Sequence, residues 1–440
     1  MNFNDCKDQY GKLMNRISVS SLALDSQPKV FEPETIDSKL TMPKYREPQL
    51  KKPHIKKSQN KGELTDKNDK DSYIDDHMSN CMIEIKTMCF PINICDLHYL
   101  PDSREGATLN YYHHKSYYVG GFSTHPIGEV SAFDHKNPSW ERTDAKTYDT
   151  LPNGSFPQGF HTTITFKDFL IVFGGSARDE CLSNVWEYEI KRQNWHYKRT
   201  YGDEVEPRKN HVACYIGFAT MFIHGGCNSK NEVLDSCLSI NLLSGKWSSL
   251  DYNCTYPSLT GHACAYVPKA ISSYCIREAN ILNRYEGVWI FGGQNEDQKP
   301  LADLYHIKLN ESIVKVNKIT PKGIGPCARY SHKMVHIPKK QFLVVLGGRN
   351  DEKFKECLTN SFDDLFIYNY RCNLWCSIKW HGISSYGARY NFSTIVKENS
   401  LFIIGGLSDG LLLDQTPISL LLDVDKKTIL TLNEMLTCVT

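Results

Sequence analysis

LIVFGG, residues 170–175, decides the fold of this 440-residue chain because it is one of six copies of the same pattern. In each copy a run of β-branched, aliphatic or aromatic residues, typical of a buried strand, ends in two glycines. Successive glycine pairs are 54, 51, 67, 55 and 58 positions apart, and a unit of about 50 residues predicts a repeat architecture. The other copies are SYYVGG ending at Gly121, MFIHGG at Gly226, VWIFGG at Gly293, LVVLGG at Gly348 and LFIIGG at Gly406.

Two further signals accompany most of the glycine pairs. A start signal, such as Arg208-Lys209-Asn210-His211, precedes the pair by about 13 to 15 positions where no insertion intervenes, and in four repeats a tryptophan follows the pair by about 20 positions. Segments of β-type residues bounded by turn formers, such as residues 184–188, lie between the pair and the tryptophan. Each unit therefore contains about four short strands, the content of one blade of a β-propeller.

Together these signals resemble the Kelch-repeat family over about residues 100–433. The resemblance implies an all-β, six-bladed Kelch-type β-propeller at residues 81–440. The fourth repeat carries an insertion, residues 268–285, which is expected to be a surface excursion between its first two strands. The first repeat has Ala107 at the histidine position, and the fourth and sixth repeats lack the tryptophan. The expected blades are residues 100–150, 151–203, 204–253, 254–320, 321–380 and 381–440.

Closure of the ring has two candidates in the sequence. In the Kelch-repeat family a strand from one terminus often completes the last blade. Residues 83–88 alternate like a strand, and residues 428–432 are also of β type, so either segment could fill this place. A closing strand would cover an edge that otherwise invites aggregation.

The first 80 residues differ in kind from the repeats. They contain several prolines and few aromatic residues, so we expect residues 1–80 to form a flexible, disordered arm. Between Lys44 and Lys61 the arm has seven Lys/Arg residues against one acidic residue, Glu47. This basic segment is interpreted as a nuclear localisation signal, as a contact for an anionic partner, or as a solvated linker.

Composition and motif searches narrow the classes of function. The formal net charge of +1 gives no global field that favours nucleic acid, and no apolar run approaches the 18 residues of a membrane span. The N-terminus has no apolar signal segment, so we expect reduced thiols and a cytoplasmic or nuclear protein. No nucleophile-elbow or P-loop motif occurs, and the four repeated histidines follow the blade period. We therefore expect no catalytic residue, metal, cofactor or small-molecule substrate.

The candidate binding residues lie in two kinds of loop. Arginines in the start signals are expected beside the loops that join consecutive blades, where they could bind carboxylates or phosphates of a partner, or pair structurally with acids of adjacent blades. The loops after the glycine pairs carry varied polar residues, and loops on a rigid scaffold concentrate binding residues. The start-signal candidates are Arg104, Arg208, Arg329 and Arg389, and the loop candidates are Arg178, Asn228, Asn295, Arg349 and Phe354.

A protein-binding scaffold or adaptor without enzymatic activity is the function that these features favour. Two alternatives within the binding class are a substrate receptor of a ubiquitin ligase and a nuclear or chromatin-associated Kelch protein. An enzyme built on a Kelch propeller is the alternative from another class, because a fold does not determine function.

Overall fold

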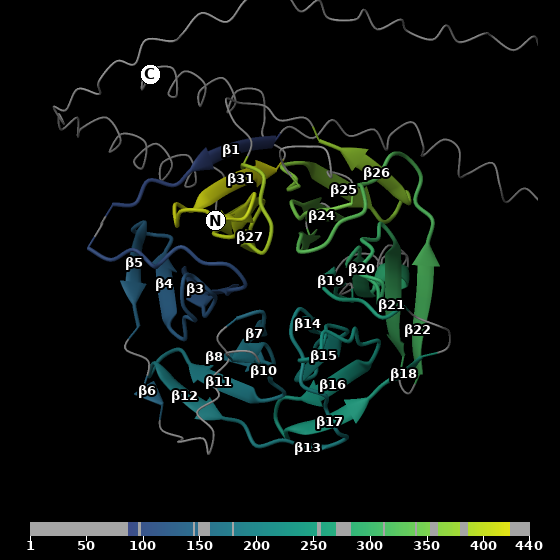
Figure 1. The fold of residues 1–440 in the computed structure, drawn as a ribbon, viewed down its shortest axis with the longest axis horizontal. Coiled ribbons are helices and arrows are strands. Elements are labelled where there is room, and N and C mark those ends of the chain that lie inside the picture. Colours follow the sequence, from purple (N-terminus) through teal and green to yellow (C-terminus); the bar gives the residue numbers. More distant parts are fainter. Residues whose placement is uncertain are drawn as a thin grey trace, which may run out of the picture. The chain divides into compact units, whose positions relative to one another are not determined.

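The computed structural model describes residues 87–95, 98–143, 146–147, 159–177, 180–252, 257–269, 283–310, 313–338, 341–352, 360–378 and 386–422. All of them belong to the second of two units of the chain, Asn80–Thr440. They form β-strands and one short 3-10 helix, η1 (Asn283–Tyr285), and six antiparallel sheets surround one axis (Figure 1). The predicted all-β, six-bladed propeller is confirmed. The arm at residues 1–80 lies outside the described residues.

Each of the first five blades has four antiparallel strands, ordered from the axis outward. The first blade contains β2 (Thr108–Tyr112), β3 (Lys115–Val119), β4 (Val130–Asp134) and β5 (Ser139–Arg142). The second contains β7 (Thr162–Phe166), β8 (Phe169–Phe173), β11 (Val185–Glu189) and β12 (Asn194–Tyr197). The third contains β14 (Val212–Tyr215), β15 (Thr220–His224), β16 (Cys237–Asn241) and β17 (Lys246–Ser249).

The fourth and fifth blades repeat this plan. The fourth contains β19 (Ala263–Val267), β20 (Gly287–Phe291), β21 (Leu304–Asn310) and β22 (Ile313–Ile319), and η1 lies between β19 and β20, in the predicted insertion. The fifth contains β23 (Lys333–Ile337), β24 (Phe342–Leu346), β25 (Leu365–Asn369) and β26 (Leu374–Ser377). Short hairpins, β9 (Ser176–Ala177) with β10 (Glu180–Cys181) and β29 (Leu407–Ser408) with β30 (Leu411–Leu412), follow two of the glycine pairs. Among the described residues there is no helix long and apolar enough to cross a membrane.

Three two-residue strands fasten neighbouring blades together. β6 (Lys146–Thr147), β13 (Tyr201–Gly202) and β18 (Asp251–Tyr252) each follow the last strand of one blade and pair in parallel with the last strand of the next blade. The sequence analysis placed these residues in the preceding blade. In the structure these residues belong to the following blade, because the connecting chain runs along the outer edge of that blade before entering its first strand.

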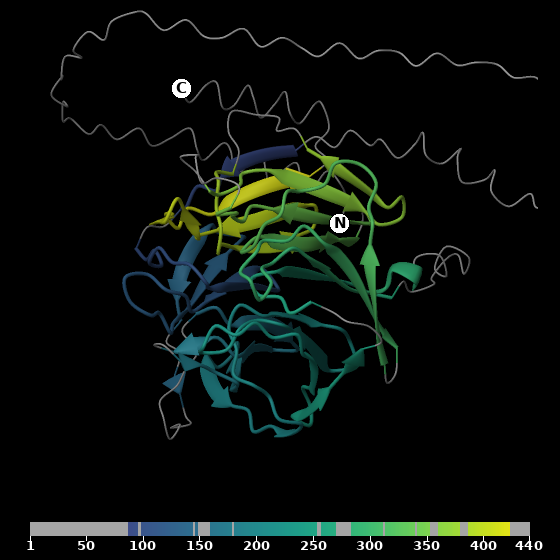
Figure 2. The same ribbon diagram turned by 45° about the vertical axis from the view of Figure 1, so that its right-hand side comes forward.

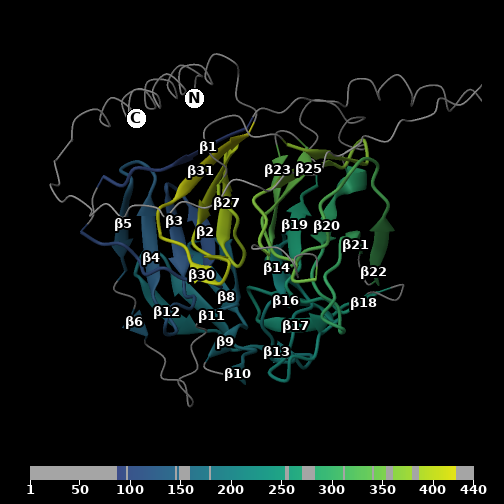
Figure 3. The ribbon, with the colours of Figure 1, turned by 45° about the horizontal axis from the view of Figure 1, so that its top comes forward.

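The sixth blade combines segments from the two ends of the described chain. β27 (Ser393–Lys397), β28 (Ser400–Ile404) and β31 (Ile418–Leu422) are completed by β1 (Thr87–Pro91), which pairs antiparallel with β31 (Figures 2 and 3). The closing strand thus begins within the predicted segment 83–88 and extends beyond it, whereas residues 83–86 and 428–432 lie outside the described residues. The chain continues to the first blade, where the Cys95 N–H donates to the Pro138 carbonyl at 2.7 Å.

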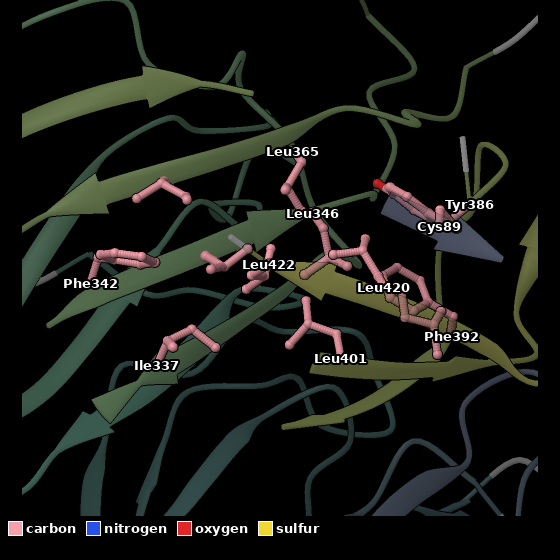
Figure 4. Close-up of a cluster of buried hydrophobic side chains, with 13 residues drawn as sticks. Cys89, Ile337, Phe342, Leu346, Leu365, Tyr386, Phe392, Leu401, Leu420 and Leu422 are labelled. Carbon is pink, nitrogen blue, oxygen red and sulfur yellow. The ribbon is translucent and has the colours of Figure 1, made fainter. Parts of the chain in front are cut away.

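The cores lie between adjacent blades, which explains why each blade needs a neighbour. One apolar cluster joins the fifth and sixth blades and includes Phe342, Leu401 and Leu420, all almost fully buried (Figure 4). The repeated tryptophans have the same role: the Trp247 ring lies 5.0 Å from the Phe173 ring of the preceding blade. Burying such a large aromatic side chain contributes strongly to stability.

Candidate protein-binding face

The innermost strands contact one another all the way around the axis, and a ring of backbone hydrogen bonds closes one end of them. One residue per blade, directly before the histidine position, has a positive φ. Its N–H donates to the carbonyl of the equivalent residue in the preceding blade at 2.8 to 3.1 Å, and Gly106 closes the ring by donating to Asn391. A left-handed backbone is unfavourable for most residues, so the ring persists because both neighbours hold it. Its members are Gly106, Phe160, Asn210, Gly261, Ser331 and Asn391.

The four start-signal arginines each lie two positions before a residue of this ring and are buried, with exposed fractions of 0% for Arg104, 1% for Arg208, 0% for Arg329 and 6% for Arg389. In each, Nε donates to the carbonyl two residues earlier. Each Nη1 donates to the carbonyl of the first glycine in the pair of its own blade, at 2.9 to 3.3 Å. The arginine therefore ties the entry loop of a blade to its glycine pair.

Acidic or polar groups complete these arginine contacts. Arg104 Nη2 donates to Glu129 at 2.8 Å, and Arg329 makes a bidentate pair with Asp364 at 2.6 and 2.7 Å. Arg208 donates instead to the Ser236 hydroxyl at 3.0 Å, and its pKa is lowered to about 10 because burial disfavours the charged form. This geometry agrees with the structural alternative for the arginines and leaves their guanidinium groups no surface for a partner.

Two of the loop candidates, Asn228 and Asn295, make hydrogen bonds within their own loops. The Asn228 side-chain oxygen accepts hydrogen bonds from the N–H groups of Lys230 and Glu232, and the Asn295 oxygen accepts from the Lys299 N–H at 2.9 Å. Asparagine side chains commonly stabilise turns in this way. Arg178 and Phe354 lie outside the described residues.

Arg349, the remaining loop candidate, stands in a cluster that joins the fifth and sixth blades. Its guanidinium carbon lies 5.6 Å from the centre of the Tyr330 ring and 4.5 Å from that of Tyr390. Asp351 accepts hydrogen bonds from Arg349 at 2.6 and 2.9 Å and from the Tyr330 hydroxyl at 2.6 Å. The Arg349 side chain is 23% exposed, so it presents a charged, oriented surface at the rim.

The first blade adds an acidic group beside this cluster. Glu105 accepts a hydrogen bond from the Asn391 side-chain amide at 2.6 Å. Burial raises the pKa of Glu105, while the Asn391 hydrogen bond and the charge of Arg349 oppose that rise. We call Arg349, Tyr330, Tyr390, Asp351 and Glu105 the Arg349 cluster.

Tyr330, Tyr390 and Glu105 are functional candidates that the sequence analysis did not select. All three lie two positions before the histidine position, where the six repeats carry five kinds of residue and tyrosine occurs twice. In all six blades this residue forms an antiparallel bridge with the residue after its own glycine pair. Across the first two blades the Phe122 and Phe160 rings stack at 5.5 Å. The signal that could have revealed Tyr330 and Tyr390 is an exposed-type aromatic residue directly after a start-signal arginine in two successive repeats.

Exposed charge on this face is mostly acidic. We call the loops from each glycine pair to the third strand of its blade the glycine-pair loops. Among their described residues the only exposed Lys or Arg side chains are Lys230 and Lys299, in addition to the partly exposed Arg349. The exposed acidic side chains are Glu180, Glu232, Asp235, Glu296, Asp297, Asp351, Glu352, Asp363, Asp409 and Asp414. The described part of this surface thus favours cationic groups, whereas the sequence analysis considered binding of anionic groups as one of two roles for the start-signal arginines.

The repeated histidines are buried and bridge adjacent blades. His161 lies 3.1 Å from the Thr108 hydroxyl, His211 2.8 Å from the Thr162 hydroxyl, and His262 3.1 Å from His224. Within the described parts of the chain, no group of three or more His, Cys, Asp or Glu side chains could hold a metal ion. Cys372 is disulfide-bonded, which corrects the expectation that all thiols are reduced. The other described cysteines are free.

Six four-stranded blades, repeated glycine pairs and loops gathered at one end define a Kelch-type β-propeller. The chain belongs to the family described as the KLHDC2/KLHL20/DRC7 Kelch-repeats domain, whose model matches residues 67–275 and 277–429. A solved structure titled "Structure of YjhT" aligns with a TM-score of 0.55 and 15% identity over 74% of this chain and 96% of that one. This likeness concerns the fold alone.

Curated relatives share less than a third of their aligned residues with this chain. Leucine-zipper-like transcriptional regulator 1 homolog of Drosophila melanogaster is 23% identical over 57% of this chain and 29% of its own length. Acyl-CoA-binding domain-containing protein 5 of Arabidopsis thaliana is 23% identical over 55% and 36%. F-box/kelch-repeat protein At1g51550 of Arabidopsis thaliana is 26% identical over 41% and 36%. The chain thus spans about a third of the length of these relatives.

Proposed function

We propose that this protein is a non-enzymatic scaffold that binds a protein partner on the glycine-pair loops, with the Arg349 cluster as the central contact. The carrying observation is the position of the Arg349 guanidinium, partly exposed and held between Tyr330 and Tyr390 by Asp351. Arginine and tyrosine dominate the energetics of protein interfaces, and pre-oriented side chains lose less entropy on binding. Kelch propellers are in general protein-interaction domains, which supports the same proposal.

The surroundings of the cluster suggest the chemistry of the partner. The exposed acidic side chains of the glycine-pair loops, such as Glu296 and Asp409, attract Lys or Arg residues. The partner segment we propose therefore carries basic residues around a group that contacts Arg349, Tyr330 and Tyr390. Steering by these charges weakens as ionic strength rises.

Comparative affinity purification tests this proposal. The full chain, Arg349→Ala and Arg371→Ala serve as baits, and captured proteins are quantified by mass spectrometry. Arg371 is a matched control because it lies in the turn between β25 and β26, at the opposite end of the same blade. Loss of a hot-spot arginine costs about 2 kcal/mol or more, so a partner kept by Arg371→Ala is expected to fall by about tenfold or more with Arg349→Ala.

Equal capture of every protein by the two variants would refute a central role for Arg349. Recovery of ubiquitin-ligase subunits among the Arg349-dependent proteins would instead select the substrate-receptor alternative. Circular dichroism of both variants verifies that the fold is intact before the captures are compared.

A further inference from the structure

Two free cysteines meet where the innermost strands of the third and fourth blades pass each other. Cys214 lies on β14 and Cys264 on β19, and these two strands are direct neighbours around the axis. The Cys264 thiol donates to the carbonyl of Ala213, the residue before Cys214, at 3.8 Å, so the two cysteines lie side by side. Both side chains are partly exposed, unlike the buried Cys89, Cys181, Cys227 and Cys237.

A lysine adds a charge to this pair. Lys333 lies at the start of β23, the innermost strand of the fifth blade, and its charge interacts with Cys264. Burial lowers the pKa of the Lys333 ammonium to about 8, while the interaction with Cys264 opposes this shift. Hydrogen bonding to Cys264, together with burial, raises the pKa of Cys214. Of the two thiols, Cys264 is thus the one beside a cationic side chain.

We propose that Cys214 and Cys264 form an oxidisable dithiol that reacts with hydroperoxides and then links the third blade to the fourth by a disulfide. The position of the two cysteines on neighbouring strands, the bond from Cys264 to the residue before Cys214, and the partial exposure of both carry this inference, and it does not depend on the proposed partner. The site is thus a modification site whose reactant is a small hydroperoxide.

The chemistry proceeds in two steps. The Cys264 sulfur loses its proton and attacks one oxygen of the hydroperoxide, the O–O bond breaks, and the departing oxygen takes that proton to leave as water or an alcohol. The Cys264 sulfenic acid that results is then attacked by the Cys214 sulfur, which forms the S–S bond. The hydroxide that leaves takes the Cys214 proton, so the second product is water. Two thiols are oxidised and one hydroperoxide is reduced.

The disulfide would act close to the binding face. Asn210 lies four residues before Cys214, and Gly261 lies three residues before Cys264. These two residues form one link of the closed backbone ring, in which the Gly261 N–H donates to the Asn210 carbonyl at 3.0 Å. A cross-link here fixes the two blades at the base of this rim. Oxidation is therefore expected to raise the melting temperature of the intact protein.

Hydrogen peroxide treatment of the folded full chain, followed by thiol blocking and non-reducing peptide mapping, tests the proposal. The expected product is a linked peptide pair containing Cys214 and Cys264, which reduction reverses. Cys214→Ser is expected to stop at a Cys264 sulfenic acid that dimedone traps, and Cys264→Ser to give neither product. Lys333→Met is expected to slow sulfenic acid formation.

A second pair of neighbouring cysteines in the chain is a control for whether closeness of two cysteines is enough for oxidation. The Cys181 thiol donates to the Cys227 carbonyl at 3.6 Å across the second and third blades, but both side chains are buried. This pair is expected to stay reduced at peroxide concentrations that link Cys214 to Cys264. The proposal fails if Cys214 and Cys264 remain reduced in the wild-type protein, or if Cys181 and Cys227 are linked first.

Discussion

Replacing Arg329 with alanine is expected to lower the free energy of unfolding by about 3 kcal/mol, the lower end of the cost of removing one partner of a buried ion pair, because the Asp364 side chain is 32% exposed. Arg329 is fully buried, and its guanidinium holds both oxygens of Asp364 and the Gly347 carbonyl. Without it the Asp364 carboxylate loses its partner and the entry loop loses its tie to the glycine pair. Urea unfolding followed by circular dichroism measures the change.

Arg349→Ala in the same blade is the control for this prediction. Arg349 is partly exposed and pairs with the exposed Asp351, so its loss is expected to cost no more than about 1 kcal/mol. Equal unfolding midpoints for the two variants would show that the buried pair contributes nothing beyond a surface pair. The contrast also means that weak partner capture by Arg329→Ala is informative only when the variant is shown to be folded.

Glycine pairs and tryptophans predicted the blades because each acts through geometry that every repeat shares. At Gly225 the backbone has a φ of +65°, and a Cβ there would lie 2.4 Å from the Leu259 carbonyl oxygen of the next blade. Such a position excludes other residues and therefore leaves a mark in the sequence. The same reasoning explains the tryptophans, since each fills the space between adjacent sheets.

The binding face was less predictable because its clusters form between blades and across the closure of the ring. Glu105 meets Asn391 although the two are 286 positions apart in the chain. The sequence also does not distinguish an arginine whose guanidinium points into the blade from one whose guanidinium points to solvent. Burial decided between the two roles: Arg104, Arg208, Arg329 and Arg389 point inward, whereas Arg349 keeps an exposed surface.

Acid is expected to destabilise the propeller well before its carboxylates are protonated. Burial lowers the pKa of His161 to about 4 and that of His262 to about 3, and it lowers the pKa of His211 and His332 well below the ordinary value. In the unfolded chain these histidines titrate near 6.5. Between pH 6.5 and about 4 the unfolded state therefore binds more protons, so the stability present above pH 6.5 is lost as the pH falls.

Each such histidine is expected to remove about 1 kcal/mol of stability per pH unit in this window, and the four act together. Urea unfolding at pH 8, 6 and 5 measures the slope. The chain supplies the control substitution, since Phe392 occupies the histidine position of the sixth blade and packs against Gly347 as His332 packs against Gly292. His332→Phe is expected to stay folded and to show a shallower slope. A pH dependence identical to that of the wild type would mean that His332 is not among the groups that protonate on unfolding.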